Sequence, residues 1–184
     1  PAEQEYAPLG FGPGANTMVS ATEDNNLLFK NIGGYLAVKF FGENISLSKV
    51  ALRGNKGEKI AGKAHVTAPL GGEPAVVMDE DATEVITVIC TDPIPIGTGA
   101  DTYTEFWFVL PPTTFEEGFT VTATDRFGGI FEKSTSKPVN ITRNHLSRMS
   151  PIEFTPLAIY FDSADLVDMP AGASREIHYT IVSS

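Results

Sequence analysis

Turn-forming residues interrupt the apolar stretches of this chain about every 8–12 residues from residue 27 onward, a spacing typical of all-β domains. The stretches between the turns are rich in Val, Ile, Thr, Phe and Tyr, which favour strands. No segment has the 3.6-residue apolar period of an amphipathic helix. Because each half-buried strand needs a second sheet to cover its apolar side, the pattern predicts an all-β fold built as a β-sandwich.

The expected strands lie between turns that contain glycine, proline or polar residues. The clearest runs are 84–90, 102–110, 119–124 and 130–135, and weaker runs cover 27–30, 35–41, 45–52, 59–67 and 139–143. The runs on either side of Gly128-Gly129 predict a hairpin. Residues 144–149 are expected to form one helical turn.

The chain divides into three predicted regions. Residues 1–26, rich in Gly, Pro, Ala, Asn and Thr, predict a flexible N-terminal arm. Residues 27–154 are expected to form the β-sandwich domain. Residues 155–184 predict a short β-rich C-terminal extension, because about 30 residues are too few for a core of their own. The extension either packs onto the sandwich or begins a second β domain.

The charge balance argues against nucleic acid as a partner. The chain has 13 Lys and Arg against 23 Asp and Glu, a net charge of −10. Phosphate binding requires clustered cations, and the same acidity disfavours docking on anionic lipid. The first residue is Pro1 and not Met, which predicts a processed N-terminus. Any signal or lipid-attachment segment would then already have been removed.

Histidine and cysteine give no pattern of a catalytic or metal site. His65, His145 and His178 lie far apart and outside any metal-binding motif, so solvent-facing positions are expected. The single cysteine, Cys90, ends an apolar run and is expected to be a buried, inert thiol.

The acidic runs are expected to be solvated turns. Residues 79–81 with Glu84, and Glu116-Glu117, lack the alternating carboxylates of a calcium loop. No pair of carboxylates is singled out for glycoside hydrolysis, although a hydrolase is a third possible class. We expect no cofactor, no metal and no enzymatic activity.

The aromatic run Phe106-Trp107-Phe108 has two interpretations. On a strand, Phe106 and Phe108 share one face, while Trp107 points the other way with Tyr103 and Glu105. The second face is either further core or a platform on which sugars stack. Trp107 and Tyr103 are therefore the tentative ligand-binding residues.

Six segments, in order, resemble one known family. They are residues 27–36, 52–62, 108–121, 133–137, 141–144 and 149–154. The most specific is Phe-Val-Leu-Pro-Pro-Thr-Thr-Phe at 108–115, followed by Gly-Phe-Thr-Val at 118–121. This order is similar to that of the Bacteroides fimbrillin-like surface lipoproteins, which are related to type V pilus subunits.

The resemblance implies a transthyretin-like β-sandwich at the cell outer membrane or extracellular surface, in a fimbrium, with a role in cell adhesion. In such fimbriae proteolysis removes an N-terminal strand, and a strand donated by the next subunit fills the groove. The implied partners are other fimbrial subunits, or a host or bacterial surface receptor. The resemblance also implies membrane attachment only through an N-terminal lipid anchor that is not present in this sequence. The alternative is a carbohydrate-binding module of an outer-membrane glycan-utilisation lipoprotein.

Overall fold

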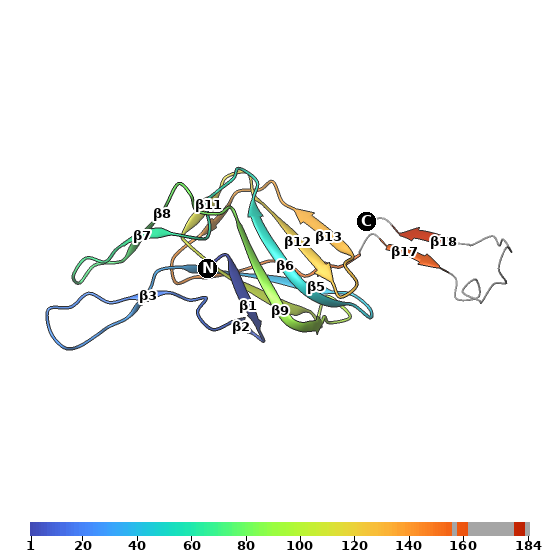
Figure 1. The fold of residues 1–184 in the computed structure, drawn as a ribbon, viewed down its shortest axis with the longest axis horizontal. Helices are drawn as coiled ribbons and strands as arrows, with labels where there is room; N and C mark the ends of the chain where they lie inside the picture. The colour runs from blue at the N-terminus through green and yellow to red at the C-terminus, as the bar shows by residue number, and fades with distance from the viewer. Residues whose placement is uncertain (156–157, 162–178, 183–184) are drawn as a thin grey trace, which may run out of the picture.

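The computed structural model describes residues 1–155, 158–161 and 179–182. All regular structure in these residues is β, and the described part of the chain contains no helix. The predicted all-β fold is therefore confirmed. Two sheets make up the body of the molecule, and further short strand pairs accompany them (Figure 1).

The larger sheet has six strands and is antiparallel except at one pair. In sheet order the strands are β13 (Ile130–Ser134), β12 (Phe119–Asp125), β6 (Ser46–Gly54), β9 (Val85–Pro95), β1 (Glu3–Ala7) and β2 (Gly10–Phe11). Only β1 and β9 run parallel, with Glu3 opposite Thr87 and Glu5 opposite Ile89.

The second sheet is organised around β5 (Gly34–Phe41). One edge of β5 pairs antiparallel with β10 (Thr104–Leu110), and the other pairs parallel with two short strands, β15 (Leu146–Arg148) and β16 (Ile152–Glu153). The remaining strands form pairs: β3 (Met18–Val19) with β4 (Lys30–Asn31), β7 (Ala64–Thr67) with β8 (Ala75–Met78), β11 (Thr113–Phe115) with β14 (Val139–Ile141), and β17 (Ala158–Phe161) with β18 (Tyr179–Val182).

The core lies between the two sheets because alternate residues of their central strands point inward. On β5 and β10, Leu36 is opposite Phe108 and Val38 is opposite Phe106, and all four are buried. The larger sheet contributes its own alternating set to the same cluster, which comprises Val50, Leu52, Ile86, Val88, Val121 and Ala123 among others. Side chains from both layers therefore share one apolar interior.

Several expected strands are confirmed, and two local expectations are wrong. Strands lie at the positions predicted for 84–90, 102–110, 119–124 and 130–135. Residues 144–149 contain β15 and no helical turn, because three of them pair with β5. The run at 27–30 enters a strand only at Lys30, and its apolar members are exposed.

The segment expected to be a flexible N-terminal arm instead contributes β1, β2 and β3. Residues 3–7 are held by β9, and Phe11 stacks on Tyr35 of the second sheet with ring centroids 5.4 Å apart. The segment thus reaches from one layer to the other. In the expected C-terminal extension, β17 and β18 pair antiparallel, and His178 lies outside the described residues.

Candidate functional site

The N-terminal strand β1 closes one side of the molecule between the two layers. Its residues alternate, with Gln4 buried, Glu3 and Glu5 exposed, and Tyr6 packed against the core. Strand β1 pairs parallel with β9, which follows it in the chain by some 80 residues. The two strands are therefore joined by a long crossover and not by a hairpin. Strand β1 therefore joins the sheet through a partner that is distant in sequence.

Gln4 joins the two layers through its side-chain amide. Its Nε2 donates to the carbonyl oxygen of Val109 at 2.6 Å, and its Oε1 accepts from the backbone nitrogen of Val109 at 3.0 Å. Val109 lies on β10, the edge strand of the second sheet. The amide thus satisfies the backbone groups that an additional strand would satisfy on a free edge.

Tyr6 fills the space beneath the same side of the molecule. Its ring centroid lies 5.0 Å from that of Phe106, and it packs against the main core cluster. Burial raises the pKa of Tyr6 and raises that of the neighbouring Cys90 thiol to about 11. The expected burial of Cys90 is confirmed, and the raised pKa keeps the thiol protonated at neutral pH.

The opposite side of the molecule carries an open groove of about 1140 Å³. Its walls include edge strand β13 of the larger sheet and the segment of β15 and β16 of the second sheet. Leu36, Phe119 and Phe131, three members of the core cluster, line it. The groove therefore combines apolar side chains with strand edges that have no neighbouring strand among the described residues.

The predicted aromatic platform occupies the outer face of the second sheet. Tyr103 is 38% exposed, and Trp107 is partly exposed on the face opposite Phe106 and Phe108. The indole nitrogen of Trp107 donates to Glu105 Oε2 at 2.8 Å. The structure thus places the two tentative ligand-binding residues on the same outer face, as the alternation predicts.

Two cations complete this platform. Lys39 Nζ lies 4.4 Å from the centre of the Tyr103 ring and 3.9 Å from Glu105. The guanidinium of Arg148 lies 5.8 Å from the centre of the Trp107 ring and 3.6 Å from Glu105. The buried carboxylate of Glu105 therefore orients both cations over the aromatic rings.

In the described part of the chain, the acidic runs lie at the surface. Each acidic run contributes to surface ion pairs: Lys63 with Asp81, Lys59 with Glu84, and Lys56 with Glu116. No group of three or more potential metal ligands lies together among the residues that the structure describes.

Two of the three histidines, His65 and His145, lie within the described residues. His65, on β7, is highly exposed and has only Asp79 near its Nε2, at 3.4 Å. His145 lies in the turn before β15, where its carbonyl accepts from the Tyr35 nitrogen at 2.9 Å.

Sequence reasoning missed Gln4 and Tyr6 because composition placed them in a flexible arm. The available signal was the alternation of Ala2, Gln4 and Tyr6 with Glu3 and Glu5, a five-residue pattern of the kind that a half-buried strand produces. Lys39 and Arg148 were missed because only the pairing of β5 with β10 and β15 brings them to the platform.

The fold and these sites define an all-β protein with two sheets around one core, an inserted N-terminal strand and an open groove. No protein-family model matches the chain, and a search of curated proteins finds no significant match. No helix within the described ranges has the length and apolar character needed to span a bilayer.

Proposed function

We propose that this chain is a structural or adhesive component of bacterial surface fimbriae that assembles through exchange of β-strands. In this proposal the two layers are a transthyretin-like β-sandwich displayed at the outer cell surface, and the chain acts without catalysis. Its partners are other fimbrial subunits or a surface receptor. The sequence resemblance and the strand arrangement both favour this function.

The observation that carries the proposal is the insertion of β1 between two sheet edges. Its backbone pairs with residues 87–89 of β9, and its Gln4 side chain bonds the backbone of Val109 on β10. Removing β1 would leave backbone donors and acceptors unpaired on both layers. It would also expose the core residues against which Tyr6 packs. A strand from a neighbouring subunit could satisfy the same groups by β-augmentation.

The groove beside β13 offers a second acceptor of the same kind. It is lined by core residues and by two edges without a neighbour among the described strands. An open apolar edge on a monomer favours association with another strand. The two sides of the molecule therefore supply the geometry that end-to-end assembly by strand addition needs.

Cleavage of the connection after β1 tests strand exchange. A protease site inserted between Pro13 and Gly14 lies in an exposed turn, where a side chain on Gly14 would have no atom within 4 Å. After cleavage, a labelled peptide of residues 1–13 is expected to replace the resident segment. A peptide with Gln4→Ala and Tyr6→Ala is the matched control and should not compete.

The cleaved protein should also form concentration-dependent oligomers, measured by analytical ultracentrifugation, that excess 1–13 peptide suppresses. The reaction rate of the Cys90 thiol reports whether residues 1–13 have left their site. The thiol should react faster with a disulfide reagent when Tyr6 is displaced. A cleaved protein that stays monomeric and exchanges no peptide would contradict the proposal.

A carbohydrate-binding role is the second candidate, favoured by the outer-face platform. Trp107 and Tyr103 offer partly exposed rings, and Arg148 supplies a half-exposed hydrogen-bond donor next to them. Sugars stack on aromatic rings and bond to charged groups at their edges.

A glycan array probed with wild type and with Trp107→Ala tests this candidate. Phe127→Ala is the control, because Phe127 is an exposed aromatic residue away from the platform. Loss of binding in Trp107→Ala alone supports a sugar site. Equal signals for both variants would remove the main support for the carbohydrate-binding module.

A further inference from the structure

Two hairpin arms project from the same end of the molecule (Figure 1). The first arm comprises residues 17–32, with β3 and β4 at its base, and the second comprises residues 62–83, with β7 and β8. Neither arm belongs to the six-stranded sheet or to the sheet around β5. We refer to the space between them as the interhairpin cleft.

Exposed apolar side chains are concentrated on these arms. Of the twelve large hydrophobic residues that are exposed in the described chain, seven lie there: Met18, Leu27, Leu28, Phe29, Val66, Leu70 and Val77. Isolated exposed apolar residues are ordinary on a protein surface, whereas a concentration of them at one place marks an interaction site. The arms are therefore the strongest candidate for a contact surface on this molecule.

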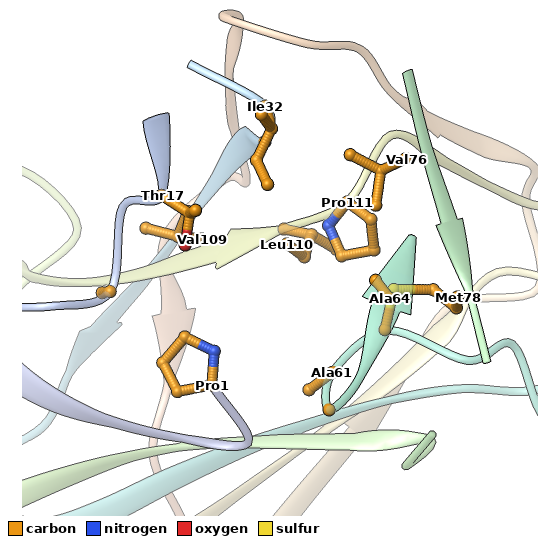
Figure 2. Close-up of a pocket in the computed structure, with 13 residues that line it drawn as sticks. Pro1, Thr17, Ile32, Ala61, Ala64, Val76, Met78, Val109, Leu110 and Pro111 are labelled. Carbon is orange, nitrogen blue, oxygen red and sulfur yellow. The ribbon is translucent and has the colours of Figure 1, made fainter. Parts of the chain in front are cut away.

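The interhairpin cleft contains two cavities. The cavity at the base, of about 90 Å³, has an apolar lining that includes Ile32, Val76, Met78 and Pro111 (Figure 2). The cavity between the tips, of about 500 Å³, is lined by residues of both loops, among them Leu28. The lower cavity can hold a single apolar side chain, and the upper one can hold several residues.

Polar contacts between the arms hold the cleft in place. Lys30 Nζ, on the first arm, donates to the carbonyl of Gly72 at 2.6 Å and lies 3.3 Å from Glu73. Arg143 bonds the carbonyl of Asn31 at 2.9 Å and also contacts Glu73. Because both cations engage the second arm or its carboxylate, the separation of the two walls is set before a ligand arrives.

The charge of the arms restricts what can occupy the cleft. Together they hold six carboxylates and two lysines, a balance of 2 − 6 = −4. Hydrogen bonds from Thr22 and Asn26 lower the pKa of Asp24, which lines the upper cavity and is thus charged at neutral pH. Like charges disfavour anionic lipid and the same face of a second copy. Glu73 and Asp81 already pair with Lys or Arg side chains, and a cationic partner would complement the remaining carboxylates of the arms.

We infer that the interhairpin cleft binds an extended segment of a partner protein, in which apolar side chains are flanked by lysine or arginine. The apolar residues enter the two cavities, and the flanking cations face the carboxylates of the arms. The upper cavity lies away from β1, whereas the lower one has Pro1, next to β1, and Val109 of β10 in its lining.

Peptide binding to the full chain tests the inference. The probe is a fluorescent Lys-Leu-Val-Leu-Val-Lys peptide, and its counterpart carries Glu in place of both Lys. Fluorescence anisotropy should show binding of the Lys-flanked peptide at least about tenfold tighter, with the difference decreasing as salt rises. Equal binding of the two peptides, or no binding of either, would overturn the inference.

Matched variants localise the interaction. Leu28→Ser with Leu70→Ser changes two exposed tip residues and should weaken binding about tenfold or more. Phe127→Ser with Ile130→Ser changes two equally exposed residues elsewhere and should leave binding unchanged. Equal loss in both variants would refute the assignment. The assignment would also be refuted if Leu28 and Leu70 were required for self-association of the protein or for its flotation with phosphatidylglycerol vesicles.

Discussion

Replacing Gln4 by alanine should destabilise the protein far more than its place near the chain terminus suggests. The variant removes both hydrogen bonds to Val109, at 2.6 and 3.0 Å, from a side chain that is only 4% exposed. A buried backbone group left without a partner costs about 1–3 kcal/mol, and two such groups remain on Val109. Allowing for water entering the space, we expect a loss of about 2–4 kcal/mol in the free energy of unfolding.

Urea denaturation and thermal melting measure this loss, and the melting temperature should fall by about 5–15 °C for a domain of this size. Glu3→Ala is the control, since Glu3 is an exposed residue on the same strand, and its effect should stay within about 0.5 kcal/mol.

Gln4→Glu adds a test of direction. It retains an acceptor for the Val109 nitrogen but places a carboxylate against the Val109 carbonyl. Its stability relative to wild type should therefore recover as pH falls toward about 4, where the carboxyl is protonated and can donate. Equal stability of Gln4→Ala and Glu3→Ala would refute the bridging role of Gln4.

Three further predictions concern other parts of the fold. Between pH 9 and 11 the free energy of unfolding should fall more in wild type than in Cys90→Ala. The pKa of the Cys90 thiol is about 11 in the folded state and 9.0 in the unfolded state, so the unfolded state loses its proton first. Urea denaturation across this pH range measures the difference. Gly118→Ala should reduce the free energy of unfolding by several kcal/mol more than Gly128→Ala does. Both glycines have a positive φ, but only at Gly118 would an added Cβ meet a backbone oxygen, at 1.9 Å. The same denaturation assay compares the two variants. Glu105→Ala should shift the fluorescence emission of Trp107, the single tryptophan, and lower the free energy of unfolding by about 2 kcal/mol. Unchanged fluorescence would contradict the hydrogen bond from the Trp107 indole nitrogen to Glu105.

The strands that could be predicted are those in which the local alternation of residues shows which face is buried and which is exposed. At 104–110, inward Phe106 and Phe108 alternate with outward Trp107, and this local period is enough to define both the strand and the platform on its outer face. The same holds for the strand near 119–124. Residues distant in sequence were not required for either prediction.

The elements that could not be predicted depend on distant partners. Strand β1 exists because β9 and Val109 bond to it, and neither lies within 80 residues of Gln4. Residues 146–148 form a strand because β5 lies beside them, although their local sequence permits a helical turn. Conversely, Leu27, Leu28 and Phe29 have strand-like residues but no sheet to cover them, so they remain exposed on an arm.

The parallel pairing of β1 with β9 also fixes an order of events during synthesis. Residues 3–7 leave the ribosome before their backbone partners at 87–89 and 109, which follow about 80 to 105 residues later. Until those partners have been made, the leading segment has no place in the sheet, and nonlocal parallel pairing is slow even afterwards. The segment therefore stays unpaired for longer than most others, and while its slow pairing with β9 proceeds, a strand from another molecule can compete with it.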